Sequence, residues 1–278
     1  MKAFKSSELK KAVLSHYDML LEKMALPFKE LTLSTRKGDT YILASGDTAN
    51  PSVIFLHGSS MNSAMWINDF NLMSQQHRVY APDIPGEPGK SDEEQLPFDT
   101  DDYTEWLTDV FDGLSIKKAA IVGASLGAWL AAKFSMMNLQ RVDKLVLLSP
   151  AGIGSQNHAF KDIAMSLLLK GEEGVTELFT VINGGNPVPE AVMDYQKLIA
   201  VSFNSRQEPI PTFSDDELMR LTMPCIIFAG EKDIMFRSDE TADRVSRLMP
   251  QAEVVILPDK GHSLTGLADR IIEFIDNA

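Results

Sequence analysis

A serine between two glycines is the residue in this sequence best placed to do chemistry. Gly123, Ser125 and Gly127 form the pattern Gly-x-Ser-x-Gly, which follows a short apolar run and precedes a helix-forming segment. On such a sharp strand-to-helix turn a serine is strained and its hydroxyl is exposed, and side chains at the glycine positions would collide with the neighbouring strand and helix. The pattern makes Ser125 a candidate nucleophile, although these five residues alone also occur by chance.

A serine hydroxyl is a weak nucleophile and needs a base, which is normally a histidine. His262 falls in a loop between the last predicted strand and the last predicted helix, at the same edge of the predicted sheet as Ser125. We therefore expect His262 to be the base. The other histidines outside the predicted active-site loops, for which we expect structural or solvated roles, are His16, His77 and His158.

The base in turn needs an acid that holds its tautomer and stabilises its cation. Asp233 and Glu231 both follow the strand predicted over 224–229, and Asp239 is a more distant alternative at the start of the next helix. A helix cap or dipole partner already explains Asp239. We expect Asp233, because the order Ser125, Asp233, His262 is the nucleophile, acid, base order of this kind of sheet.

A tetrahedral oxyanion needs two preorganised N–H donors. For this arrangement one donor follows the nucleophile and the other lies in the loop after the third strand, which points to the backbone of Leu126 and Ser59. His57 begins that loop. We expect His57 to shape the loop through hydrogen bonds to the backbone rather than to act as a second base.

One segment mimics a phosphate-binding loop. Residues 84–91 end in Gly-Lys-Ser after a predicted strand, but Ile84 stands where that motif requires glycine, and the acidic residues 92–94 follow where an anion-binding helix should begin. We interpret it as a loop at the edge of the active-site cleft. Because no two histidines are four residues apart and there is no cysteine pair, we expect neither a metal nor a cofactor.

Short β-type runs alternate with helical runs along most of the chain. A hairpin is predicted over 31–35 and 40–45. Further strands are predicted over 53–56, 78–83, 119–124, 144–148, 224–229 and 252–257, with helices over 62–75, 103–114, 128–137, 238–248 and 263–275. This alternation predicts an α/β fold, an open and mostly parallel sheet with helices on both faces.

The alternation is interrupted over 155–215, where helical patches at 158–170, 172–182 and 189–203 contain no convincing strand. We interpret this segment as a helical insert that lies over the carboxyl ends of the strands, where open α/β sheets bind ligands. The predicted organisation is an amphipathic helix within 1–25 that docks onto the body, a core formed by 26–154 and 216–278, and the insert as a cap.

Composition is that of an ordinary globular protein, with 44% hydrophobic and 23% charged residues. The net charge of −13 argues against nucleic acid as a partner. No run approaches the ~18 apolar residues that a membrane span requires. Cys225 is the single cysteine, and with no secretory signal at the N-terminus we expect a cytoplasmic protein. Oligomeric state is not predictable from these features.

The substrate is expected to be a small molecule with an apolar acyl or alcohol part. Apolar side chains near Ser125 and in the insert are candidates to line its pocket, with core packing as the alternative for each. They are Met61, Met65, Trp129, Phe160, Met165, Leu169, Phe179 and Tyr195.

Together these motifs resemble the α/β-hydrolase superfamily, in particular its single-domain, esterase-like branch with a helical cap. The resemblance covers about residues 30–278 and rests on five motifs in the same order: His57-Gly58, Asp83-Ile84-Pro85-Gly86, Gly123-Ala124-Ser125-Leu126-Gly127, Gly230-Glu231-Lys232-Asp233 and Gly261-His262. It implies an eight-stranded, mostly parallel sheet with an antiparallel second strand, a cap between strands six and seven, and serine hydrolase chemistry on Ser125, Asp233 and His262.

Some residues depart from branches of this superfamily. A serine at position 125 differs from the aspartate of haloalkane dehalogenases, and Ala124 differs from the tryptophan often found there in proline iminopeptidases. The loop Pro-Gly-Glu-Pro-Gly-Lys-Ser has one residue more than the usual Pro-Gly-x-Gly-x-Ser. The expected reaction is hydrolysis of a small carboxylic ester through an acyl-enzyme. Lactone, thioester or carbon–carbon bond hydrolysis and perhydrolysis are alternatives. A small-ligand receptor or a non-catalytic module on the same fold is an alternative of another class.

Overall fold

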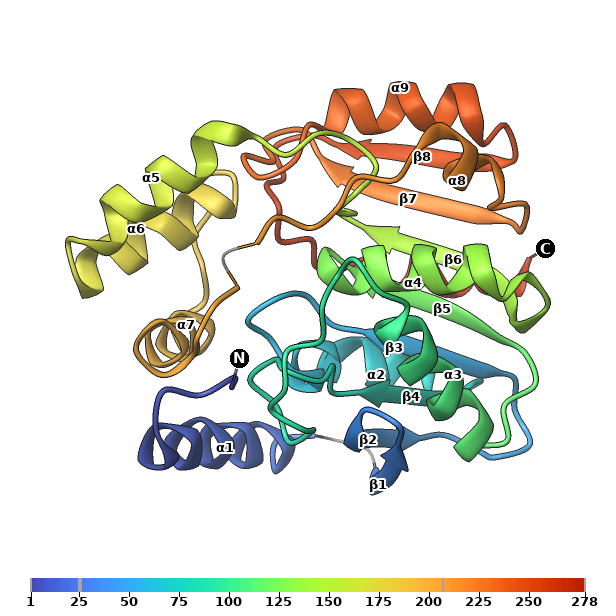
Figure 1. Cartoon of the computed structure of the whole chain (residues 1–278), viewed down its shortest axis with the longest axis horizontal. Helices are drawn as coiled ribbons and strands as arrows, with labels where there is room; N and C mark the ends of the chain where they lie inside the picture. The colour runs from blue at the N-terminus through green and yellow to red at the C-terminus, as the bar shows by residue number, and fades with distance from the viewer. Residues whose placement is uncertain (1, 25–26, 207, 278) are drawn as a thin grey trace.

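The fold is built on one eight-stranded sheet (Figure 1). The computed structural model describes residues 2–24, 27–206 and 208–277. The strand order is β1-β2-β4-β3-β5-β6-β7-β8, and β2 runs antiparallel to both of its neighbours whereas the remaining pairs are parallel. The strands are β1 (Lys29–Thr35), β2 (Gly38–Ser45), β3 (Ser52–Leu56), β4 (Arg78–Pro82), β5 (Ala119–Ala124), β6 (Val142–Leu148), β7 (Cys225–Gly230) and β8 (Ala252–Leu257).

Helices cover both faces of this sheet. Alternate residues of a strand point to opposite faces, and in β3 Ile54 packs into one hydrophobic cluster whereas Val53 and Phe55 pack into the other. The continuous apolar run of β3 is explained by burial on both sides. One face is covered by α3 (Asp102–Gly113), α4 (Leu126–Met137), α8 (Asp215–Met219) and α9 (Ser238–Leu248), and the other by α1 (Ser7–Leu21), α2 (Ile67–Met73) and α10 (Ala268–Asp276).

The predicted α/β pattern is confirmed, with three differences. The helix predicted over 62–75 is a 3-10 turn, η1 (Ser63–Trp66), followed by α2. The last helix begins at Ala268 and not at residue 263. Gly266 has a left-handed conformation with φ 75°, and a right-handed helix cannot continue through such a residue. The short helix α8 was not predicted, although Ser214 and Glu217 form a capping box at its start.

Between β6 and β7 the chain forms α5 (His158–Leu168), α6 (Glu172–Ile182) and α7 (Glu190–Ser202), which lie beyond the end of the sheet (Figure 1). The N-terminal helix α1 joins the two parts. Its Tyr17 packs into the cluster on the sheet, and Val13 packs with Phe4 against α7. In the part of the chain that the structure describes, no helix is long and apolar enough to cross a membrane.

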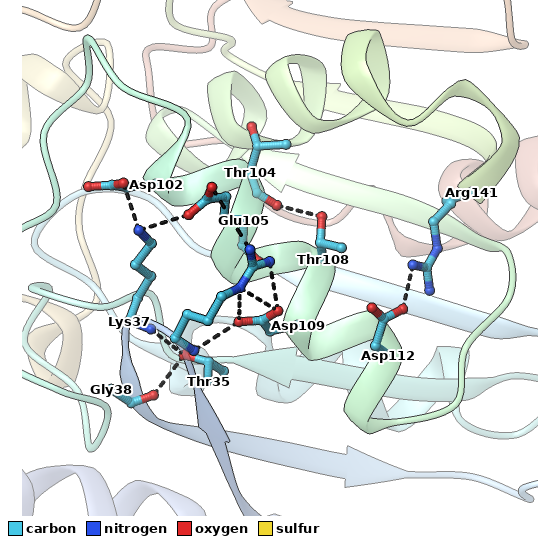
Figure 2. A network of polar contacts seen from close by, with 11 residues as sticks. Thr35, Lys37, Gly38, Asp102, Thr104, Glu105, Thr108, Asp109, Asp112 and Arg141 are labelled. Atoms are coloured by element: carbon cyan, nitrogen blue, oxygen red, sulfur yellow. Dashed lines mark hydrogen bonds and ion pairs between the residues drawn. The ribbon is translucent and has the colours of Figure 1, made fainter.

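The hairpin at the antiparallel edge is tied to α3 by ion pairs (Figure 2). The guanidinium of Arg36 lies 2.8 Å from Asp109, and the ammonium of Lys37 lies 2.7 Å from Asp102 and 2.9 Å from Glu105. Because these groups are exposed or partly exposed to solvent, each pair contributes little to stability. Their role is to set where the hairpin turn meets the helix.

Candidate active site

Ser125 occupies the turn between β5 and α4. Its backbone angles, φ 52° and ψ −111°, lie outside the regions that non-glycine residues ordinarily adopt. The turn is held by the Ser125 N–H, which donates to Leu148 O at 2.9 Å, and by the Ser125 carbonyl, which accepts from the Trp129 N–H at 3.1 Å. This is the strained strand-to-helix turn that the sequence predicts.

The two flanking glycines leave no room for a side chain. A Cβ at Gly127 would lie 2.1 Å from the carbonyl oxygen of Leu56, and a Cβ at Gly123 would lie 2.4 Å from the carbonyl oxygen of Gly127. Both contacts are with backbone, which cannot move aside as a side chain can. Close packing of α4 against β3 and β5 therefore requires glycine at both positions.

Asp233 and His262 form a hydrogen-bonded pair at the same edge of the sheet. His262 Nδ1 lies 2.8 Å from Asp233 Oδ2, and the two side chains are 11% and 1% exposed. The other carboxylate oxygen of Asp233 accepts the N–H groups of Met235 at 2.7 Å and Phe236 at 3.1 Å. An aspartate with this second set of donors is fixed in orientation, so that it holds the proton of His262 on Nδ1 and leaves Nε2 as the acceptor.

The two alternative acids lie elsewhere. Glu231 is exposed and accepts the Asp259 N–H at 3.3 Å, and Asp239 is paired with Arg237 at 2.9 Å on the surface. The structure separates the three acidic residues that the sequence offers for this role. Asp233 is the one hydrogen-bonded to His262.

The backbone of His262 is anchored on both sides. Its N–H donates to Ile182 O at the end of α6, and its carbonyl accepts the hydroxyl of Ser149, both at 2.8 Å. Ser149 follows Leu148, whose carbonyl holds the Ser125 N–H. The loops that carry Ser125 and His262 are therefore both attached to the end of β6, and one of them is also attached to α6.

The loop after β3 lies against the nucleophile turn. A Cβ at Gly58 would lie 3.6 Å from both the Cβ of Ser125 and the carbonyl oxygen of Ala124. Among the described residues no acceptor is hydrogen-bonded to the N–H of Ser59 or of Leu126. These are the two N–H groups that the sequence singles out as oxyanion donors.

His57 is fully buried, and both of its ring nitrogens are hydrogen-bonded to backbone. The Ile84 N–H donates to Nε2, which makes Nε2 the acceptor and Nδ1 the donor to Gly58 O, both at 2.9 Å. Burial lowers the pKa of His57, so that the ring stays neutral. This is the loop-shaping role expected from the sequence.

The remaining histidines lie away from this pair. His16 packs against Tyr195 with ring centroids 5.5 Å apart, and buried His77 lies 3.1 Å from Asp276. His158 is exposed at the start of α5. None of them contacts Ser125, Asp233 or His262 through a polar interaction among the described residues.

The loop after β4 contains a buried residue that the sequence analysis missed. Glu87 lies in the part of this loop that is one residue longer than the usual pattern, and its carboxylate accepts the Ser60 N–H at 2.7 Å. Two further side chains brace the loop: Asp83 accepts the Ser63 N–H at 2.9 Å, and Asn62 donates to Pro88 O at 3.0 Å. An insertion in an otherwise familiar loop was the one signal that could have drawn attention to Glu87.

The residues predicted to line a pocket have several different environments. Trp129 is a core residue, since it is 2% exposed, stacks on Phe213 and donates its indole N–H to Pro211 O at 2.9 Å. Met165 and Leu169 on the outer side of α5 and its end are 51% and 84% exposed. Neither environment is that of a pocket wall, because the first faces the interior and the second faces solvent.

Met65 packs on the cluster at the sheet, and its sulfur accepts the Gly58 N–H at 3.4 Å. The other four residues lie where the helical segment meets itself or the core. Phe160 and Phe179 pack on the small cluster formed by α5 and α6. Tyr195 on α7 accepts a hydrogen bond from Asn62 at 3.1 Å, and Met61 packs in the same cluster as Tyr195. Tyr195 on α7 is thus brought next to the loop after β3, which contains Met61.

Within residues 2–24, 27–206 and 208–277, no three histidine, cysteine, aspartate or glutamate side chains are grouped as metal ligands. Cys225 is buried in β7, and burial raises the pKa of its thiol to about 12. Such a thiol stays protonated and unreactive at neutral pH.

Comparison with known proteins agrees with the fold described above. Residues 53–274 match the model of the alpha/beta hydrolase family. Carboxylesterase YbfK of Bacillus subtilis is 31% identical over 259 residues, 90% of this chain and 86% of that protein. Its crystal structure superposes with a TM-score of 0.88 at 29% identity, over 98% of this chain and 99% of that one. The structure of naproxen esterase (carboxylesterase NP) of Bacillus subtilis gives 0.88 at 27% identity, covering 98% and 100%.

Proposed function

Because this chain belongs to the alpha/beta hydrolase family and is a hydrolase, we propose that it cleaves small carboxylic esters through an acyl-enzyme on Ser125. His262 is the general base and Asp233 its acid partner. The observation that carries the proposal is the 2.8 Å hydrogen bond between His262 Nδ1 and Asp233 Oδ2. The loop of His262 is attached to the same strand end as the strained turn of Ser125. Relatives named carboxylesterases support the choice of an ester.

Each proton in the reaction has a donor and an acceptor. His262 Nε2 removes the Ser125 hydroxyl proton while Oγ forms a bond to the ester carbonyl carbon. The resulting oxyanion accepts the N–H groups of Ser59 and Leu126, and the C–O bond to the alcohol breaks as His262 returns its proton to that oxygen. Water then attacks the acyl-enzyme, giving its proton to His262, and release of the carboxylic acid restores the Ser125 hydroxyl.

Three features of the site lower the barrier. The two backbone donors together stabilise the developing oxyanion, at about 3 kcal/mol for each donor. Asp233 keeps the Nδ1–H tautomer and stabilises the imidazolium that forms in each half-reaction. The turn at Ser125 costs backbone strain, and the surrounding hydrogen bonds hold the turn in this conformation.

The substrate is a small molecule with an apolar acyl or alcohol part, and residues 155–215 form the cap that selects it. Support comes from the hydrogen bond between the His262 N–H and Ile182 O, which brings the end of α6 to the base. Met61 and Tyr195, at the contact between α7 and the loop after β3, are the pocket candidates best placed to contact substrate.

The test combines turnover with covalent labelling. The wild-type protein is expected to hydrolyse short p-nitrophenyl esters and to react with a fluorophosphonate at the peptide that contains Ser125. Ser125→Ala should lose both properties, and Asp233→Asn should lower kcat by about 10³- to 10⁴-fold. Ser166→Ala, which removes an exposed hydroxyl from α5, is the control and should match the wild type. Esterase activity retained by Ser125→Ala contradicts the proposal.

A further inference from the structure

Glu87 places a carboxylate in the interior next to the oxyanion loop. Its side chain is 1% exposed, and burial raises its pKa to about 7. A buried carboxyl group is costly unless its oxygens have partners. One partner is the Ser60 N–H, which donates to Oε2 at 2.7 Å, and the other is Arg206, whose Nε lies 3.9 Å from Oε1.

The hydrogen bond from the Ser60 N–H to Glu87 lies at a strained position of the backbone. Ser60 has φ 61°, a left-handed conformation that costs energy for a residue other than glycine. Its N–H belongs to the peptide that links Ser59 to Ser60, so an acceptor at Oε2 fixes the plane of that peptide. Ser59, whose N–H is the proposed oxyanion donor, is therefore held on both sides. On one side is the fixed peptide to Ser60, and on the other is Gly58, which lies against Ser125.

Arg206 reaches Glu87 from the segment between α7 and α8. Its guanidinium stacks over Phe98 at 4.6 Å and donates to Leu96 O at 2.8 Å. The side chain is 10% exposed, and among the described residues its Nε has no hydrogen-bond acceptor. The guanidinium also pairs with the exposed carboxylate of Glu208 at 3.1 Å, so its charge is shared between Glu208 and the buried Glu87. The contact with Glu87 joins the end of the helical segment to the loop after β4.

We propose that Glu87 is a positioning residue for the oxyanion hole: through the Ser60 N–H it holds the Ser59 N–H in the direction that binds the oxyanion, and Arg206 holds Glu87. The inference rests on the proposed function and adds to it a side chain that touches neither substrate nor Ser125. Both the charged carboxylate and the neutral acid have an oxygen that accepts the Ser60 N–H. The acceptor is therefore the essential feature of the side chain, and the charge is not.

The experiment separates the acceptor from the charge. Glu87→Gln keeps a side chain of the same length that ends in an oxygen acceptor, and kcat should stay within about threefold of wild type. Glu87→Met keeps the size and removes the acceptor, and kcat on a p-nitrophenyl ester should fall ten- to a hundredfold with KM within twofold, since an oxyanion donor acts in the transition state. Glu93→Met is the matched control, because Glu93 lies in the same segment and pairs with Lys10 away from the loop.

A transition-state mimic supplies a readout that a merely structural role does not change. A trifluoromethyl ketone forms an oxyanion on the nucleophile, and its affinity for Glu87→Met should fall by the same factor as kcat/KM. If circular dichroism shows that Glu87→Met is not folded, Glu87→Asp takes its place. This variant moves the carboxylate away from Ser60 by one methylene group, and its kcat should be about tenfold lower than that of the wild type. Glu87→Met with wild-type kcat, or with reduced kcat and unchanged ketone affinity, overturns the inference.

The same data distinguish this inference from the proposed function. An active wild type, an inactive Ser125→Ala and an unchanged Glu87→Met leave the esterase proposal standing and refute the role of Glu87. A wild-type protein that hydrolyses no ester refutes both.

Discussion

Two histidines lie close to the nucleophile turn, and their hydrogen bonds give them different roles. His57 is fully buried with both nitrogens bonded to backbone groups, so neither is available for proton transfer. His262 is partly exposed and uses Nδ1 for Asp233, which leaves Nε2 as a base. The same side-chain chemistry thus serves structure in one loop and, in our proposal, catalysis in the other.

His57 should make stability depend on pH. Burial lowers its pKa, so as the pH falls below about 6.5 the unfolded chain takes up a proton that the folded chain does not. The contribution of neutral His57 is complete above that pH and is lost as the pH falls through the lowered pKa. His57→Gln should lower the free energy of unfolding by about 1–3 kcal/mol at pH 7.5, and this deficit should shrink at pH 5.

Urea denaturation of the wild type and the variant across this pH range checks the prediction. His158→Gln, on the exposed start of α5, is the control and should follow the wild type at each pH. A deficit for His57→Gln that stays constant or grows at acid pH would falsify the assignment of His57 as a buried neutral group.

At the scale of elements, the close approach of α4 to β3 and β5 sets the position of Ser125. The glycines on both sides of the serine let helix and strand backbones approach to distances that no Cβ tolerates. The carbonyl at the end of β6 then fixes the turn through the Ser125 N–H. The strain at Ser125 is sustained because three strands and one helix all constrain the same turn.

Replacing Gly127 should therefore be costly for stability. Gly127→Ala puts a methyl group 2.1 Å from the Leu56 carbonyl oxygen, and relief requires movement of α4 or β3. We expect a loss of at least about 3 kcal/mol in the free energy of unfolding, measured by urea denaturation. Gly58→Ala, whose Cβ meets nothing closer than 3.6 Å, should lose less than about 1 kcal/mol. Equal losses for the two variants would be evidence against this account of the turn.

Across the whole molecule, the packing of the sheet differs from that of the helical segment between β6 and β7. Helix α4 buries most of its residues against the sheet, whereas α5 buries only Leu167 among its described residues. The cluster shared by α5 and α6 has three buried members, Leu167, Leu178 and Ile182. A segment with so few buried contacts opens more readily than the core does.

Native-state hydrogen exchange should reveal this difference. Amides within α5 and α6 are expected to exchange with an opening free energy a few kcal/mol below that of amides in β3, β5 and β6, because opening the segment exposes little apolar surface. The comparison is internal, since all amides are measured in one sample by mass spectrometry or NMR. Exchange of α5 amides as slow as that of β5 amides would refute the prediction.

Much of the fold and of the candidate site could be predicted from the sequence alone. The alternation of buried strands with amphipathic helices specifies the α/β class, because each element has to bury an apolar face against another layer. The glycines around Ser125 and the order Ser125, Asp233, His262 identify the nucleophile turn and the loops at one sheet edge. These are local patterns, and they can be predicted because they depend on the backbone geometry of neighbouring residues.

Tertiary structure alone decided which side chains meet. The choice of Asp233 over Glu231 and Asp239 depends on which carboxylate faces the His262 ring. Trp129 lies in the core rather than in a pocket because of how α4 packs on its neighbours. Glu87 meets Ser60 and Arg206 although 27 residues separate it from Ser60. Such contacts come from packing between segments far apart in the chain, which spacing along the sequence does not encode.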